Sequence, residues 1–594
     1  MKLINVINAS YTNILSITEK NTSKSKDKKI RCAFLRDITI EPLVPFFKYQ
    51  CLSKGIEAEV FINEYDNIMQ EVLDDNSNLY SFNPNIIFLF TNLNRVAPKL
   101  ESIILSKNMD DINNVLLEAS DYYERIITSI RKKSESNIVI CNLALDPYPI
   151  YGISDIQNPY GYINSIKSIN SKISLKSNLN KDVNILDINL LISRIGYNNF
   201  FDKRNYHLSK NPFSTNGLRY LAFECVKYIS SLKSLSKKCI VLDCDNTLWG
   251  GVIGEDGLEN ILCGDNHPGS YFKNFQKKLI QLKNSGILLA ISSKNNLEDV
   301  LEVFLKHPEV ILSKDDFVSI KVNWNEKSKN IIEISQELNI SLDHIIFVDD
   351  SEFEIEMVNK TLPEVDTVLV PKDLSSLESI FDYEDFFNSL NSSTADKDRT
   401  SMYLAEKERA RDKKISTNIQ DYFNELNLVT RSSFAKEIEI QRVVQLTQKT
   451  NQFNLTTKRY NQSEVEYLIK SDHSDIITIE AEDKYGKYGL IGLAILKFEN
   501  KTIIIDSFLM SCRALGRGIE KVLLDDCLKL AKKRKSVEII GQYLQTEKNK
   551  QVQNFYIENG FKLKSQNNNK TFEYNLTDFK TERIIPRYIV AKKK

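Results

Sequence analysis

Two aspartates separated by one cysteine stand at the end of an apolar run. The segment CIVLDCDNT, residues 239–247, places Asp243, Cys244 and Asp245 directly after four apolar residues. Alternation along an extended strand directs residues i and i+2 to one side, so Asp243 and Asp245 are expected to converge while Cys244 turns away. Two carboxylates held close repel each other unless a cation lies between them or one is protonated. The spacing therefore predicts a cation-binding or proton-transferring pair.

Further polar groups follow other apolar runs of the same region. Asp349 and Asp350 end HIIFVDD, Ser292 and Ser293 end GILLAISS, and Lys327 lies in WNEKSKN. A hard Mg²⁺ ion bound by a few carboxylates and a substrate phosphate would unite these groups. A carboxylate could then attack phosphorus to form an aspartyl-phosphate, while a serine and a lysine neutralise the phosphate oxygens.

The order DxDxT, strand-end serine, lysine and DD resembles the haloacid dehalogenase (HAD) superfamily. The segment before Ser293 has room for a flap and a helix but not for a full cap domain, so an uncapped site that is open to large substrates is expected. The resemblance implies a nucleophile, a general acid/base, a phosphate-binding serine and a charge-stabilising lysine, with Mg²⁺ held by four acids. The nucleophile would be Asp243 and the general acid/base Asp245. The phosphate-binding serine would be Ser293, or Ser292 because the register is ambiguous by one, and the charge-stabilising lysine would be Lys327. The metal ligands would be Asp243, Asp245, Asp349 and Asp350.

These residues require three α/β regions to position them. Residues 1–230 alternate β-branched runs with helix-like stretches, which predicts a parallel sheet covered by helices. Residues 236–385 repeat the βα rhythm, and four of their strands lead into polar residues, where ligands bind in open sheets. Residues 386–430 read as a linker and a helix, and residues 431–580 as a mixed α/β unit. The tail PRYIVAKKK is expected to be loose.

The third region carries a glycine-containing turn between a strand and a helix. SCRALGRGIEKVLL has glycines that let the backbone approach a phosphate, at a helix start that supplies free N–H donors. With NFYIENGFK downstream, this region resembles the GNAT-type acetyltransferase fold, whose corresponding loop binds the pyrophosphate of coenzyme A. The resemblance implies phosphopantetheine or coenzyme A as cofactor, held by Arg513, Gly516, Arg517, Gly518 and Tyr556.

The long motifs LDCDNTLWGGVIGEDG, LTQKTNQFNLTTKRY and LMSCRALGRGIE resemble the FkbH-like HAD-IIIC proteins over most of the chain. This resemblance implies transfer of a glyceryl unit from 1,3-bisphosphoglycerate to the phosphopantetheine thiol of an acyl carrier protein, with removal of phosphate. The product would be a glyceryl thioester for polyketide- or tetronate-type biosynthesis. Two alternatives are a small-molecule phosphatase with an inert C-terminal fold, and an N-acyltransferase that moves an acyl group from acyl-CoA to an amine.

The family resemblance also implies a cysteine that holds the acyl group transiently. Cys244 is close to the nucleophile, but strand alternation directs it away from Asp243. Cys512 ends a strand beside the predicted pantetheine loop and is the preferred candidate. Either residue could instead be a small buried hydrophobe, which is common for cysteine.

The N-terminal region resembles the sheet of SGNH-type hydrolases, a flavodoxin-like three-layer fold. At the nucleophile position, however, the chain has Ile38 followed by Thr39, so ester hydrolysis is not expected. Asn92 and His207 are interpreted as surface or capping residues. A scaffold or carrier-docking role is the favoured interpretation.

Composition excludes several classes of partner. Lys+Arg and Asp+Glu both number 79, so no basic field favours nucleic acid. No window approaches the roughly 18 apolar residues of a membrane span, and the polar first thirty residues do not resemble a signal peptide. Nine scattered cysteines without a CxxC pair suit a reducing compartment. We therefore expect a cytoplasmic enzyme that needs neither nucleic acid nor membrane.

Overall fold

The structure is a computed structural model. It describes residues 11–20, 29–106, 109–180, 182–382, 384–388, 390, 400, 402–405, 408–409, 412, 418–450, 452–511, 514–546, 549–566, 570–576 and 585–593. The chain divides into two compact units, Met1–Lys233 and Ser234–Lys594. No helix among these residues is both long and apolar enough to cross a bilayer. Parts of the predicted linker, including residues 391–399 and 413–417, lie outside the described residues.

The first unit contains a five-stranded parallel sheet in the order β2-β1-β3-β4-β5. This is the flavodoxin-like strand order of doubly wound folds. The parallel sheet covered by helices is therefore confirmed, whereas the SGNH-type assignment stays a prediction. The strands are β1 (Lys29–Arg36), β2 (Glu57–Ile62), β3 (Ile86–Phe90), β4 (Asn137–Cys141) and β5 (Val183–Leu186).

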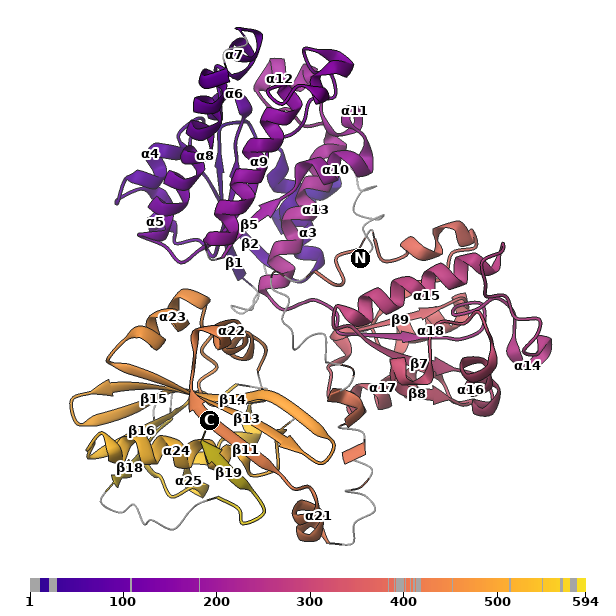
Figure 1. The fold of residues 1–594 in the computed structure, drawn as a ribbon, viewed down its shortest axis with the longest axis vertical. Coiled ribbons are helices and arrows are strands. Elements are labelled where there is room, and N and C mark those ends of the chain that lie inside the picture. The colour runs from indigo at the N-terminus through magenta and orange to yellow at the C-terminus, as the bar shows by residue number, and fades with distance from the viewer. Residues whose placement is uncertain are drawn as a thin grey trace. The chain divides into compact units, whose positions relative to one another are not determined.

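Helices cover both faces of this sheet, as Figure 1 shows. On one face Phe34 and Phe88 pack against Phe47 of α3 (Leu43–Ser53). On the other, Ala33 and Leu35 belong to a core with α8 (Met109–Arg131) and α9 (Tyr162–Leu179). The remaining helices are α2 (Tyr11–Lys20), α4 (Ile68–Leu73), α5 (Asn78–Phe82), α6 (Leu93–Val96), α7 (Leu100–Ser106), α10 (Ile188–Ile195), α11 (Tyr197–Phe200), α12 (Lys203–Ser209) and α13 (Thr215–Leu232).

The second unit begins with another five-stranded parallel sheet, in the order β10-β9-β6-β7-β8. All five strands are at the predicted places, and β6 is central because it pairs with both β7 and β9. The strands are β6 (Cys239–Leu242), β7 (Leu288–Ser293), β8 (Phe317–Val322), β9 (Ile345–Asp349) and β10 (Asp366–Leu369). The helices are α14 (Ile253–Asp256), α15 (Gly269–Asn284), α16 (Leu297–Lys306), α17 (Lys327–Leu338) and α18 (Glu352–Thr361).

A third sheet, also within the second unit, is mostly antiparallel. Its order is β17-β18-β16-β15-β14-β13-β11-β19, with β12 on β15, and the pairs β15–β16 and β11–β19 are parallel. The strands are β11 (Val429–Phe434), β12 (Phe453–Asn454), β13 (Ser474–Asp483), β14 (Gly486–Glu499), β15 (Thr502–Met510), β16 (Glu538–Tyr543), β17 (Lys562–Gln566), β18 (Lys570–Asn575) and β19 (Val590–Lys593). The helices are α21 (Ile419–Glu425), α22 (Ile440–Lys449), α23 (Gln462–Lys470), α24 (Ile519–Lys533) and α25 (Phe555–Glu558).

The prediction of a loose tail is wrong for residues 590–593. They form β19, which pairs in parallel with β11, and Val590 donates its N–H to Leu428 O at 2.9 Å. The sheet therefore extends past the predicted domain end at residue 580. A four-residue strand with exposed charged side chains gives little sequence signal, because its pairing comes from backbone groups alone.

Candidate active site

The carboxyl edge of the second sheet gathers the predicted acids. Asp243 follows β6 and donates its N–H to Val348 O at 3.0 Å, while Asp349 ends the neighbouring strand β9. Parallel neighbouring strands end at the same edge, so the two carboxylates meet there. Both are buried, with 6% of Asp243 and none of Asp349 exposed. Two buried carboxylates at one place require a positive partner.

Lys327 is that partner. It opens α17, and its Nζ lies 2.8 Å from Asp243 Oδ1 and 2.5 Å from Asp349 Oδ2. Burial acts to lower the pKa of Lys327, but Asp243 and Asp349 outweigh burial and hold the pKa above its ordinary value. The lysine therefore stays charged. Burial and the nearby Asp243 raise the pKa of Asp349, although Lys327 opposes this shift. One ammonium only partly compensates the two acids.

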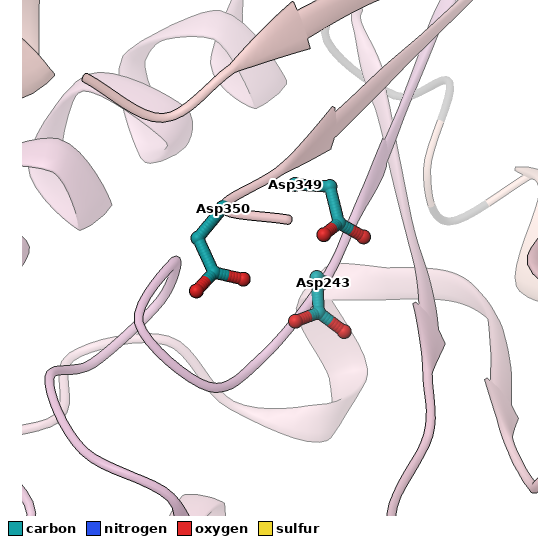
Figure 2. A group of neighbouring side chains, drawn as sticks. All are labelled: Asp243, Asp349 and Asp350. Carbon is teal, nitrogen blue, oxygen red and sulfur yellow. The ribbon is translucent and has the colours of Figure 1, made fainter. Parts of the chain in front are cut away.

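Asp350 adds a third carboxylate beside this pair. Oxygen atoms of Asp243, Asp349 and Asp350 all lie within 4.8 Å of one another, and Figure 2 shows the three side chains facing a common space. Asp350 is exposed, so this space opens to solvent. Several carboxylate oxygens with an open side form the donor set that suits Mg²⁺, which keeps some of its ligands from water or substrate phosphate. The residues present therefore fit the predicted metal.

The Asp245 side chain lies outside that cluster, and its predicted role as a metal ligand stays a prediction. Its Oδ1 accepts hydrogen bonds from Trp249 Nε1 at 3.0 Å and Ile253 N at 3.3 Å, and its Oδ2 accepts one from Asn295 Nδ2 at 3.0 Å. The physical reason is that β6 ends at Leu242, so strand alternation does not extend to Asp245. Burial raises the pKa of Asp245, and these donors oppose the shift. An acid held beside the nucleophile suits proton transfer.

The two serines at the end of β7 point to different partners. Ser293 Oγ accepts a hydrogen bond from Asn295 Nδ2 at 3.2 Å, and the same amide contacts Asp245. Ser292 Oγ instead accepts from Asn330 of α17 at 3.3 Å. Ser293 is thus linked to the Asp245 side of the site, whereas Ser292 is held against a helix; the phosphate-binding role stays a prediction.

Asn246 connects the site to the loop that follows it. It has a left-handed backbone (φ 50°), and its Oδ1 accepts a hydrogen bond from Gly251 N at 2.9 Å. Its side chain also bonds Asp350, one of the three clustered acids. Between Asp245 and β7, a stretch that is described throughout, only this loop, α14 and α15 occur, so no cap domain covers the site.

The two candidate cysteines have different outcomes. Cys244 is fully buried in an apolar core with Leu242 and Trp249, as alternation predicts for the side opposite Asp243. Burial raises the pKa of its thiol well above the ordinary value, which disfavours the reactive thiolate. Cys512 and the neighbouring Arg513 lie outside the described residues.

The other predicted pantetheine residues are engaged with the protein itself. The Arg517 guanidinium lies over the Tyr488 ring, 5.4 Å from its centroid. Gly518 (φ 75°) is packed so closely that an added Cβ would come within 2.7 Å of Pro586. Tyr556 is 1% exposed and covers a glycine of β16. Only Gly516, among the described members of the predicted set, is exposed.

The four candidate residues of the first unit, Ile38, Thr39, Asn92 and His207, do not come together as a catalytic group. Ile38 is buried, Asn92 caps α6 by accepting from Asn94 N, and His207 is an exposed residue of α12. Thr39 donates its hydroxyl to Ser209 O at 2.5 Å. These contacts are capping and loop contacts, in line with the interpretation from the sequence.

Sequence reasoning missed Asn295 and Trp249, which hold Asp245. Asn295 follows the β7 serines by two residues, and Trp249 lies in the loop after Asp245. Trp249 is itself fully buried in the core of this domain, so one side chain both packs and holds Asp245. Trp324, the other tryptophan, is 71% exposed at the end of the β8–α17 connection.

The comparisons with known proteins cover both units. A model of the FkbH N-terminal domain family matches residues 32–230. The N-terminal part of protein BF1531 from Bacteroides fragilis, which contains a phosphatase domain and was solved in complex with Mg, is 26% identical, with a TM-score of 0.58. The match covers 64% of this chain and all of that chain, whereas no curated protein matches.

The C-terminal region matches acetyltransferase structures only weakly. The ribosomal-protein-S18-alanine N-acetyltransferase from Escherichia coli is 8% identical, covering 26% of this chain and 97% of that one, with a TM-score of 0.21. The spermidine N-acetyltransferase from Vibrio cholerae, in complex with CoA and spermine, is 16% identical, covering 25% and 96%, with a TM-score of 0.21. Scores this low carry no conclusion about the domain.

A parallel sheet with β6 at its centre and an acid–lysine–acid cluster at its carboxyl edge defines a HAD-type domain. The matched N-terminal domain and the similarity to the BF1531 structure support an FkbH-like protein of the HAD superfamily.

Proposed function

We propose that this protein is a Mg²⁺-dependent enzyme that transfers a glyceryl unit from 1,3-bisphosphoglycerate to the phosphopantetheine thiol of an acyl carrier protein and removes phosphate. The phosphatase activity is supported by one side-chain cluster, in which Lys327 lies between Asp243 and Asp349 and Asp350 is beside them. The Mg complex of the BF1531 phosphatase domain supports the choice of metal. The resemblance of the long motifs to FkbH-like proteins supports the acyl group and the carrier.

The chemistry at phosphorus follows from the positions of the side chains. A carboxylate oxygen of Asp243 forms a bond to phosphorus, and the substrate oxygen leaves with a proton from Asp245. Water then attacks the aspartyl-phosphate while Asp245 takes the proton, which regenerates Asp243 and releases phosphate. Lys327 and Ser293 neutralise and orient the phosphoryl oxygens. A metal held by Asp243, Asp349 and Asp350 would supply further charge neutralisation at the phosphoryl group.

The acyl transfer is a separate bond exchange. The carbon–oxygen bond of the acyl phosphate is replaced by a carbon–sulfur bond to the carrier, the thiol loses its proton, and phosphate is the leaving group. The uncapped site gives a carrier-bound arm access, because the loop after Asp245 and α14 are the only insertion before α15.

The proposal is tested by incubating the protein with Mg²⁺, 1,3-bisphosphoglycerate and a holo carrier protein, and by reading both free phosphate and carrier mass. A glyceryl mass gain with phosphate release is expected. Phosphate release without any mass gain of the holo carrier would refute the acyl transfer and favour the small-molecule phosphatase.

A further inference from the structure

The parallel strands β15 and β16 pair only over their first four residues. Their register runs from Thr502 with Glu538 to Ile505 with Gly541, and beyond this point the two strands are not paired. Separating strands leave backbone N–H and C=O groups without partners, and an extended chain of amides can pair with such groups. Pantetheine contains two amides, so this gap is the place in the domain where its arm could add like a strand.

The gap is filled by the protein's own segment. β12 pairs antiparallel with the end of β15, through Phe453 with Met510 and Asn454 with Leu509. Leu455 then bridges both sides: its N–H donates to Phe508 O at 3.0 Å, and its carbonyl accepts from Leu544 N, just past β16, at 2.8 Å. The backbone groups that an arm would need are therefore already used.

Side chains fix this segment in the gap. Thr456 Oγ1 donates to Asp506 O at 3.0 Å on the β15 side. On the other side, the buried Asn549 donates from Nδ2 to Asn454 O at 2.9 Å and to Leu544 O at 2.8 Å. Leu455 has no exposed surface. The segment is thus an integral part of the sheet, with backbone, amide and apolar contacts on both sides.

The predicted diphosphate position at the start of α24 is also occupied by the protein. Glu520, in the first turn, bonds its own backbone N–H and has a buried Oε2, so a carboxylate sits where free N–H groups would attract an anion. Pro586 and Tyr588 cover Gly518, and the Tyr588 hydroxyl donates to Arg517 O at 3.3 Å. Glu520 therefore already uses one of the N–H groups that a diphosphate would need at this helix start.

We infer that the C-terminal domain does not bind acyl-CoA, because its own residues occupy the two positions that an acyl-CoA would need. These residues are Phe453–Thr456 in the strand gap and Glu520 at the helix start. The enzyme then receives its acyl group only as an acyl phosphate, a donor assignment that rests on the proposed function. This excludes the N-acyltransferase alternative, which needs an acyl-CoA in this domain.

Hydrogen exchange of the full-length protein, read by mass spectrometry on peptides covering 450–460 and 540–546, tests the filled gap. The Leu455 and Leu544 amides should exchange at least roughly a hundredfold more slowly than in an unfolded chain, with or without 1 mM acetyl-CoA. Titration calorimetry with acetyl-CoA, in the presence of phosphate to occupy the Asp243 site, should give no saturable binding. Rapid exchange of both amides, or saturable acetyl-CoA binding that slows their exchange, would overturn the inference.

A matched pair of variants tests whether Asn549 holds the segment in the strand gap. Asn549→Ala deletes the amide that clamps the segment and should raise exchange of peptide 450–460 by roughly tenfold or more. Asn559→Ala removes another buried amide, which donates to Phe555 O at 2.6 Å, and should leave that peptide unchanged. Equal exchange in both variants would contradict the clamp. These readouts do not depend on phosphate release or carrier mass, so they fail separately from the proposed function.

Discussion

Replacing Lys327 with methionine removes the one ammonium shared by two buried acids. Its Nζ lies 2.8 Å from Asp243 and 2.5 Å from Asp349, and the lysine itself is 4% exposed. Removing one partner of a buried ion pair costs about 3–5 kcal/mol, because the other charge stays buried without compensation. We expect Lys327→Met to lose about this much free energy of unfolding in buffer containing EDTA.

Tryptophan fluorescence during urea unfolding measures this loss in the right domain, since the two tryptophans, Trp249 and Trp324, both belong to the HAD-type domain. Lys329→Met is the matched control: Lys329 lies on the same helix, 66% exposed, and its pair with Glu326 is worth less than about 1 kcal/mol. Added Mg²⁺ should restore part of the stability of Lys327→Met, because a cation again lies among the acids. Equal stability of the two variants in EDTA would refute the reasoning.

Three further predictions concern other parts of the chain. Burial, then Asp66, raises the pKa of Asp37 from 3.8 to about 6, so the folded state binds this proton more tightly and stability should fall as pH rises from about 4 to about 6. Asp37→Asn should remove that fall and gain up to about 3 kcal/mol at pH 7, measured by urea unfolding. Cys512→Ser should abolish labelled acyl-enzyme in a gel assay while Cys244→Ser retains it; the reverse would favour Cys244. Gly541→Ala should lower the melting temperature by several degrees, because its Cβ would come within 2.4 Å of a buried tyrosine ring.

The sequence predicted the parts of the fold that have strong periodic patterns. Every strand of the HAD-type sheet was expected, because each is a run rich in apolar and β-branched residues, and four of them lead into polar residues. The meeting of Asp243, Lys327 and Asp349 was also expected, since strands of a parallel sheet end at one edge. In contrast, β2 was not singled out: EAEVFI has only one fully buried residue and carries a weak apolar signal.

The remaining differences come from local backbone changes and long-range partners. Alternation was applied beyond the end of the strand, because β6 ends at Leu242, before Asp243–Asp245, and the left-handed Asn246 then turns the chain. The sequence did not indicate a strand at the segment containing Leu455. Its true place depends on two strands that begin about fifty and eighty residues later in the chain, and a short polar run does not encode that pairing.

The most direct test of the central claim compares the wild-type protein with Asp243→Asn in the presence of Mg²⁺, 1,3-bisphosphoglycerate and a holo carrier protein. Intact-protein mass spectrometry of the carrier and a free-phosphate assay are read from the same reaction. The account predicts a glyceryl mass gain and phosphate release with the wild type, and no dephosphorylated glyceryl group on the carrier and less free phosphate with Asp243→Asn. An Asp243→Asn protein that still delivers a dephosphorylated glyceryl group to the carrier would contradict the assignment of Asp243 as nucleophile.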